Sequence, residues 1–493
     1  MTETKFLTYV KKGYNYTESI IKKFVFTDFY LILVCAAVFI GWATKCAPFG
    51  LGSIILVSCI ALLFADDILP LTVNLFSGVL AIYSYDFSDY VYLWPLAIPL
   101  FICLIFFMVK NRKSEFRLGK MFFPLMAVAI ALLVGGIGYG DGDTHWNNFL
   151  RALPDFCMLG LAVPLIYLLY SNYLKRDDER DIPLYFSKTL MYLGLVISLQ
   201  LISVISTSNI PVSEWQHTVW DIGWANRNGI ATYLTFTAGM TVYLSTRYRQ
   251  GWIYLLFALM QYVCLILTFS RGGIIFGTLS GIIAIIIAII KAPNKKIFAI
   301  YLAAILLAAL IVYLAARENV NEVIQALLER GTGTSGRFEL YKEAWGLFKD
   351  HPFLGVGRGY VGTGTIPNEI GIYWFHSTIF QILAGMGLVG LVAYVYYYVI
   401  RFKILFMNFK NSFNLFVLAV WIGFEGYCLI NTGTFIGYPY MALVIVMTLL
   451  LERTQKDFNN YVTPYNCSTA IGAKIAKAGG FRQYINIKKG KNN

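Results

Sequence analysis

The sequence predicts an all-α polytopic membrane protein with about 12–14 transmembrane helices and one large loop. Hydrophobic residues make up 58% of its 493 residues, charged residues only 14%, and the mean hydropathy is +0.63. This composition is typical of a chain that crosses a membrane repeatedly and excludes an ordinary soluble protein. Apolar runs of roughly 17–22 residues recur along the chain, and each is long enough to cross the hydrocarbon core of a bilayer.

The apolar runs give fourteen candidate spans. The first, from about 29 to 43, follows a segment without a secretory cleavage signal, so we expect it to stay in the mature protein as a transmembrane helix. The apolar pattern is weakest at 69–84. The expected spans lie near 28–45, 48–65, 69–84, 91–109, 121–139, 152–171, 184–206, 228–245, 252–269, 272–290, 297–315, 377–400, 414–431 and 437–451.

The distribution of lysine and arginine predicts the orientation. With both termini inside, the inside segments hold 30 of the 40 basic residues and the outside segments hold 10. Short loops on the cytoplasmic side are enriched in this way, so we expect the long loop to face outward. The net charge of +13 is therefore interpreted as a topology signal beside anionic lipid headgroups, and no nucleic-acid partner is expected.

Four segments follow from this pattern: N-terminal transmembrane helices over 1–315, an outer catalytic loop over 316–376, C-terminal helices over 377–452 and a basic cytoplasmic tail over 453–493. The tail is polar, and we expect it to be poorly ordered. Inside the loop, aromatic residues at helical spacing predict an amphipathic helix that lies on the membrane surface or packs on neighbouring loops. These aromatics are Phe338, Tyr341, Trp345 and Phe348.

Two arginines stand where the outer segments are otherwise poor in positive charge. Arg271 follows Ser270 and precedes Gly272 and Gly273, between two apolar runs, and Arg227 lies at the same boundary one hairpin earlier. Each side chain alone is explained equally well by pairing with lipid headgroups. Two at one depth favour an anion site, because guanidinium groups hold phosphate bidentately, and the glycines leave room for a ligand or backbone.

Two further polar residues occupy unusual places. His376 immediately precedes a long apolar run at the outer boundary. A helix cap is the simpler interpretation, but a neutral imidazole among arginines and aromatics has the properties of a general base. Glu425 interrupts an apolar run, and an intramembrane carboxylate indicates either function or pairing with one of the arginines.

The sequence indicates no metal and no cofactor. It has no D-x-D motif, no carboxylate-rich outer loop and no nucleotide-binding fingerprint. The eight cysteines form no C-x-x-C pair, so neither a zinc site nor a disulfide framework is predicted.

Three short motifs resemble the O-antigen ligase and polymerase superfamily. They are Thr268-x-Ser-Arg-Gly-Gly, His351-Pro-Phe-Leu-Gly-Val-Gly-x-Gly, and His376 followed by Ile-Leu-Ala-Gly-Met-Gly-Leu-Val-Gly. Their order and outward placement are more specific than any one of them, and the resemblance covers about 220–395. One departure is Ser377, where the family often has asparagine, which puts acceptor positioning by that neighbour in doubt.

The resemblance implies a GT-C-like, metal-independent, inverting glycosyltransferase in the cytoplasmic (inner) membrane, with its active site on the extracytoplasmic face. Its donor would be an undecaprenyl-pyrophosphate-linked glycan, its acceptor another glycan or lipid-linked glycan, and membrane lipids would surround it. By this resemblance Arg227 and Arg271 hold the pyrophosphate and His376 acts in catalysis. Further candidates for substrate binding are Arg337, Arg358, Glu425, Tyr360 and Tyr438.

Three functions fit these observations. The first is a polymerase that joins lipid-linked repeat units into capsule, exopolysaccharide or O-antigen. The second is a ligase that passes finished glycan to lipid A-core or another surface acceptor. A lipid-linked oligosaccharide transporter is the third, although a transporter favours charges throughout the bilayer depth and two related halves, which this chain lacks.

Overall fold

The computed structural model describes residues 3–84, 86, 88–112, 115–140, 142–175, 180–215, 217–329, 336–362 and 373–454. Within these ranges the protein is built of helices and has no strand, which confirms the predicted all-α fold class. The predicted tail beyond 454 lies outside the described residues.

The helices before the long loop run as follows: α1 (Glu3–Phe24), α2 (Asp28–Ala43), α3 (Ala47–Phe64), α4 (Leu71–Ser77), α5 (Ser88–Val91), α6 (Ala97–Lys110), α7 (Phe122–Val134), α8 (Gly142–Asp155), a π-helical turn (Phe156–Ala162), α9 (Val163–Tyr173), α10 (Ile182–Thr207), α11 (Arg227–Arg247), α12 (Gly251–Leu267), α13 (Arg271–Lys291) and α14 (Lys295–Ala315). The loop contributes α15 (Arg317–Glu329) and α16 (Arg337–Asp350). After it come α17 (Thr378–Met407), α18 (Ser412–Cys428) and α19 (Ala442–Arg453).

Fewer helices than predicted are long and apolar enough to cross a membrane alone. By length and composition the described residues contain six such helices, or seven if the bent pair α1 and α2 is one span. Four predicted spans form apolar helices of at most 17 residues, because their apolar runs continue into turns beyond the helix ends. The expected helix at 69–84 is wrong: α4 ends at Ser77 and a 3-10 turn over Val79–Ala81 follows.

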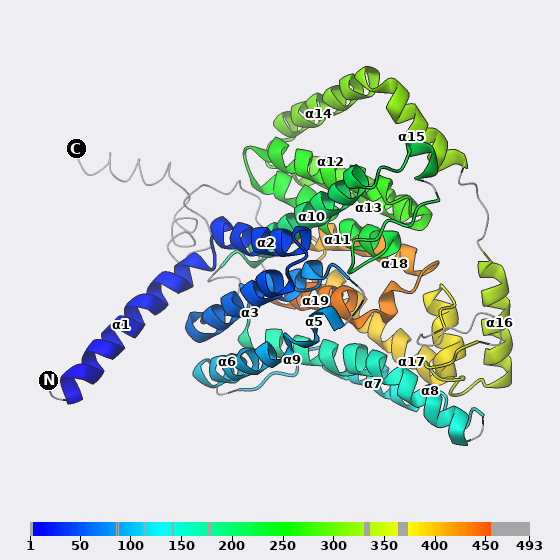
Figure 1. Cartoon of the computed structure of the whole chain (residues 1–493), viewed down its shortest axis with the longest axis horizontal. Coiled ribbons are helices and arrows are strands. Elements are labelled where there is room, and N and C mark those ends of the chain that lie inside the picture. Colours follow the sequence, from blue (N-terminus) through cyan, green and yellow to red (C-terminus); the bar gives the residue numbers. More distant parts are fainter. Residues whose placement is uncertain are drawn as a thin grey trace.

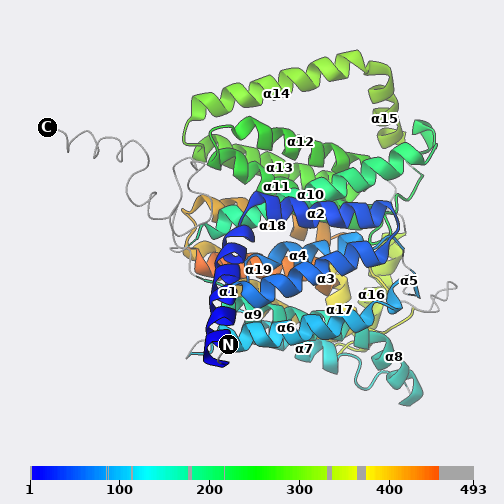
Figure 2. The same cartoon turned by 60° about the vertical axis from the view of Figure 1, so that its left-hand side comes forward.

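The helices form a bundle around α11 (Figures 1 and 2). Both views place α14 at one outer edge and α6 and α7 at the opposite edge. Almost every residue of α11 from Ile230 to Arg247 is buried, and its neighbours are α10, α12, α13 and α18. A helix enclosed by protein needs no apolar surface toward lipid, which explains why α11 is rich in threonine.

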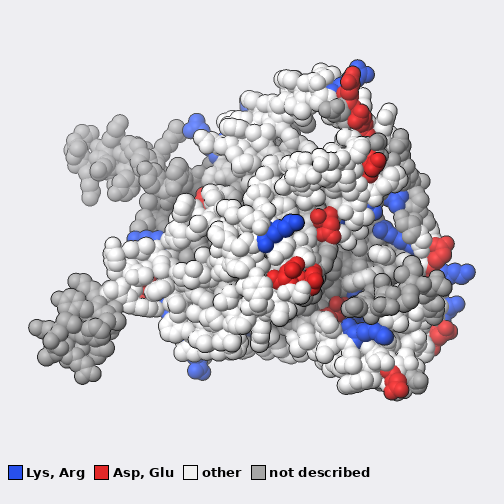
Figure 3. Space-filling view, in the orientation of Figure 1, with Lys and Arg blue, Asp and Glu red and all other residues white. Residues whose placement is uncertain are grey.

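The predicted inside and outside segments lie at opposite ends of the bundle. Ion pairs join the inside segments to one another, as between Lys188 and Asp28 at 2.9 Å and between Arg180 and Asp67 at 2.9 Å. The N-terminal helix lies at this end, and α8, α15 and α16 lie at the other (Figure 1). Between the ends, wide bands of the surface in Figure 3 carry no charge, as a membrane-embedded wall requires.

The long loop is hydrogen-bonded into a break in α17. Gly387 has φ +58° and ψ −149°, which interrupts the helix and frees backbone groups on both sides. The amides of Val356 and Gly357 donate to the carbonyls of residues 384 and 385, at 2.8 and 3.1 Å. In return the amides of residues 388 and 389 donate to the carbonyls of Pro352 and Phe353, at 2.8 and 3.2 Å. The segment from His351 to Gly357 thus satisfies the backbone of a membrane helix, as an apolar environment demands.

Candidate active site

Three of the predicted site arginines are the first residues of helices. Arg227 begins α11, Arg271 begins α13 and Arg337 begins α16. The exposed amides at a helix start carry a partial positive charge, so each helix adds to the positive potential of its own arginine. Such an arrangement suits a phosphate or diphosphate group.

Tyr427 of α18 lies within electrostatic range of two of these arginines. Its hydroxyl is 2.8 Å from the hydroxyl of Ser270, which donates to the side-chain carbonyl of Asn228 at 2.9 Å. Arg227 lies within electrostatic range of both Tyr427 and Arg271. Arg337 lies within range of Tyr427 as well. The structure therefore relates the three arginines through Tyr427 and Arg227, although the first and the last of them are 110 positions apart along the chain.

The two glycines after Arg271 serve the packing of helices. A Cβ on Gly272 would come within 2.5 Å of the Tyr427 ring, and one on Gly273 would come within 2.5 Å of Ala231. The room that the sequence indicated for a ligand is therefore filled by side chains of α18 and α11. The glycines let the start of α13 approach Tyr427, and this approach places Arg271 in the group.

His376 lies beside Arg337 in a strained backbone conformation. Its φ is +51°, a left-handed conformation uncommon for a residue with a side chain. The hydroxyl of Tyr341 donates to the His376 carbonyl at 3.2 Å, which links the residue to α16. Among the described residues, the buried Nδ1 atom has no hydrogen-bond partner. Strain of this kind is concentrated at functional sites, where the surrounding structure has to enforce it.

Burial and a neighbouring charge keep the His376 imidazole neutral. Desolvation, and then the positive charge of Arg337, lower the pKa of His376 below its usual value of 6.5. Both effects disfavour the imidazolium form, since that form is itself positive. At neutral pH the side chain is therefore able to accept a proton.

The amphipathic helix of the loop, now seen as α16, packs against α17. The ring of Tyr341 stacks on Phe380 with a centroid distance of 4.7 Å. Phe338 and Trp345, by contrast, are 67% and 47% exposed. The helix thus has a packing face and also a free aromatic face, which are the two alternatives that the sequence left open.

Arg358 is buried and forms an ion pair. Its Nε lies 2.9 Å from a carboxylate oxygen of Asp155. The guanidinium lies over the rings of Trp374 and Phe435, with distances of 4.2 and 5.0 Å to the centroids. The ion pair links the loop to α8, and substrate binding by Arg358 stays a prediction.

The two tyrosines predicted to bind sugar are anchored to protein. Tyr360 is 5% exposed, its hydroxyl donates to Glu343 at 3.1 Å, and its ring stacks on Phe375. The hydroxyl of Tyr438 donates to the carbonyl of Leu75, and its ring stacks on Phe76. Both rings therefore pack against protein in this structure, and their role in substrate binding stays a prediction.

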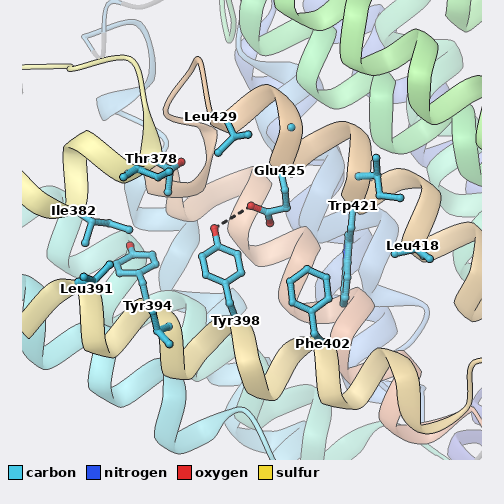
Figure 4. A pocket seen from close by; sticks show the side chains of 14 residues that line it. Thr378, Ile382, Leu391, Tyr394, Tyr398, Phe402, Leu418, Trp421, Glu425 and Leu429 are labelled. Carbon is cyan, nitrogen blue, oxygen red and sulfur yellow. Dashed lines mark hydrogen bonds between the residues drawn. The ribbon is translucent and has the colours of Figure 1, made fainter. Parts of the chain in front are cut away.

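The sequence left two interpretations of Glu425, a functional role or pairing with one of the site arginines. In the structure Glu425 pairs with a different arginine, Arg401. The Glu425 carboxylate accepts from Arg401 at 2.6 Å and from the Tyr398 hydroxyl at 2.9 Å (Figure 4). Arg401 is fully buried and lies over Trp421 at 4.4 Å. The carboxylate thus belongs to an ion pair inside the bundle, and substrate binding by Glu425 stays a prediction.

Sequence reasoning missed Tyr427, Ser270 and Asn228. Two of them stand next to the arginines already singled out, so adjacency was the available signal for Ser270 and Asn228. Tyr427 had no such signal, because 34 tyrosines occur in the chain.

Residues 253–395 match the family model of the O-antigen ligase. The match begins inside α12 and ends inside α17, so it contains the starts of α13 and α16 and the whole of the loop. A comparison with curated proteins gives no match. The matched segment includes Arg271, Arg337, Arg358, Tyr360 and His376, whereas Arg227, Glu425 and Tyr438 lie outside it.

Proposed function

We propose that this membrane protein, whose residues 253–395 match the O-antigen ligase family model, polymerises lipid-linked oligosaccharide repeat units into a surface polysaccharide. The donor is undecaprenyl-pyrophosphate-linked glycan, and the acceptor is a second glycan. One observation carries the proposal: three arginines, each at the start of a helix, lie in electrostatic range of Tyr427 or of one another, and Arg337 lies in range of His376.

The chemistry assigns a role to each side chain. When the glycosyl–pyrophosphate bond breaks, its electron pair stays on the phosphate oxygen. Arg227 and Arg271 stabilise the negative charge that grows there, and preorganised donors are most effective against charge that develops in the transition state. His376 removes the proton from the acceptor hydroxyl, whose oxygen attacks the anomeric carbon from the face opposite the leaving group. The configuration at that carbon is therefore inverted.

The proposed active site faces outward. All three arginines belong to the ten basic residues of the predicted outside segments. The segment 316–376, which we propose to be catalytic, is the outer loop of the predicted topology. Arg337 extends the positive potential toward the acceptor side, next to His376. A ligase that passes glycan to lipid A-core or another surface acceptor would use the same donor half, and only the acceptor would differ.

Purified protein with a lipid-linked repeat unit as the only substrate tests the proposal. A polymerase is expected to give a ladder of products and free undecaprenyl pyrophosphate. A ligase gives product only when a separate acceptor is added. EDTA is expected to leave the rate unchanged, since arginine charges balance the leaving diphosphate. No transfer with either acceptor would refute an enzymatic role, and rescue of an EDTA-treated sample only by Mg²⁺ or Mn²⁺ would refute the arginine mechanism.

The pH dependence of transfer should report His376. Neutral imidazole is the active form, so the rate is expected to fall as the pH drops through the lowered pKa, at a pH below 6.5. Arg337→Gln removes one cause of the lowering, so its acid limb is expected to move to higher pH. Lys349→Gln, at the exposed far end of α16, is the matched control and should not move it. An identical limb in all three proteins would exclude His376 as the titrating base.

A further inference from the structure

α1 is an amphipathic helix that leaves the bundle at the end of the predicted inside segments (Figures 1 and 2). One side of its second half packs on the ends of α3 and α6. The ring of Tyr14 lies 5.4 Å from the ring of Phe64, and Glu18 pairs with Lys110 at 2.7 Å. These contacts hold the helix to the bundle and leave another side of residues 13–24 exposed.

The exposed side of α1 carries an apolar row. Tyr16 and Ile20, which are four residues apart and therefore on one face, are 71% and 50% exposed. Phe24 is the next residue of this row, and its ring lies 6.0 Å from the ring of Phe29 at the start of α2. Phe29 and Leu33 are exposed along α2, as is typical of a surface that meets acyl chains. The apolar row of α1 is therefore continuous with a lipid-facing surface of α2.

The bend between α1 and α2 directs α1 along the membrane surface. The two helices are together apolar enough for one span, but they are bent by 80° at the break between them. α2 packs against α3 and α10, which run the length of the bundle (Figure 2). A helix nearly perpendicular to these lies close to the membrane plane, so α1 has the direction of an interfacial helix and not of a span.

The charge of α1 complements an anionic surface. The helix holds five lysines and two glutamates. Glu18 is already engaged by Lys110 and, at 3.2 Å, by Lys22, whereas Lys23 is exposed. Lysines beside an apolar face are attracted to the anionic phospholipids of the cytoplasmic leaflet. An acidic protein would also satisfy the lysines, but the continuity of the apolar row with α2 requires hydrocarbon at the same place.

We propose that α1 lies in the headgroup layer of the inside leaflet, with Tyr16, Ile20 and Phe24 toward the acyl chains and its lysines on anionic phospholipid. This contact goes beyond the proposed function and uses none of the residues of the candidate active site. It depends on the predicted orientation, in which the N-terminus is inside. The protein thereby has a fixed lipid contact at the end of the bundle opposite to the candidate active site.

Photocrosslinking of the full-length protein in lipid nanodiscs tests the position of α1. The probe p-benzoylphenylalanine replaces Ile20 in one variant and Asn15 in the other. Asn15 is also exposed but lies about 140° away around the helix, so it is the matched control. In discs that contain phosphatidylglycerol, the probe at position 20 is expected to give roughly fivefold more lipid adduct than the probe at position 15. Equal yields, or an adduct at position 20 with a second copy of the chain in place of lipid, would overturn the proposal.

A change of lipid tests the role of charge. With phosphatidylcholine alone, the lipid adduct from position 20 is expected to fall about fivefold, because the anionic surface that attracts the lysines is gone. Lys12→Gln combined with Lys23→Gln should remove most of this difference between the lipids. Lys295→Gln combined with Lys296→Gln takes the same charge from exposed residues of another inside segment and should keep the difference. The same yield from both lipids in the wild-type protein would overturn the assignment to anionic phospholipid, as would equal effects of the two double variants.

Discussion

Replacing His376 is expected to stop glycan transfer while the donor still binds. Loss of a general base lowers a rate by about 10²–10⁴-fold. Two variants separate chemistry from backbone strain, because alanine is disfavoured at a φ of +51° whereas asparagine tolerates this conformation. His376→Ala and His376→Asn should both be inactive. The measurement is product chain length and donor accumulation in a deletion strain at matched membrane levels.

The control for this prediction is His217→Ala. His217 is an exposed histidine of an outer segment, outside the arginine group, and its loss should leave polymer length unchanged. Normal activity of His376→Asn, which keeps the backbone but lacks a base, would remove the imidazole from the mechanism. Loss of donor binding in either variant would assign His376 to the anion site instead.

Arg271→Lys is expected to fail almost as completely as Arg271→Ala. A lysine keeps the charge but cannot reproduce the planar fork that holds two phosphate oxygens. Removal of one preorganised donor costs about 10²–10³ in kcat, or roughly 2.7–4 kcal/mol. Steady-state kinetics with the purified enzyme should show a lower kcat with a smaller change in KM, because the arginine acts most strongly on the leaving-group charge.

Arg151→Lys provides the matched substitution for Arg271→Lys. Arg151 is an exposed outer arginine on α8 and should tolerate lysine with unchanged kinetics. Wild-type kcat in Arg271→Lys would show that a point charge suffices and that bidentate contact plays no part. A change confined to KM would place Arg271 in ground-state binding alone.

The sequence could predict the elements better than the contacts between them. Long apolar runs predicted the helices because hydropathy and length are properties of one segment. The same criterion overcounted spans where an apolar run continued through a turn, as at 69–84, because hydropathy does not record where hydrogen bonding ends. It also could not show that α11 is enclosed by protein, since burial depends on the other helices.

The candidate site shows the same limit. Arg227, Arg271 and His376 could be proposed as site residues from the sequence, because each stands at one end of an apolar run, which is a local signal. The partners of Arg358 and Glu425 could not be predicted. Asp155, for example, is 203 positions from Arg358, and nothing in the sequence relates the two residues. Arg401 directly follows the predicted span 377–400, and the structure shows it inside the bundle against Glu425. Charge alone does not distinguish a residue that faces substrate from one that neutralises a neighbour.

The joint between the loop and α17 sets the boundaries for exchanging parts between related enzymes. Residues 352–357 and 384–389 share four backbone hydrogen bonds across the break at Gly387, so they form one unit although 26 residues separate the two stretches. In a chimera that receives a foreign loop ending at 376, residues 352–357 would come from one protein and residues 384–389 from the other, although the two stretches are hydrogen-bonded to each other. A swap intended to change acceptor specificity should therefore exchange all residues of the loop and of α17 through 389, so that the junction lies after the break at Gly387.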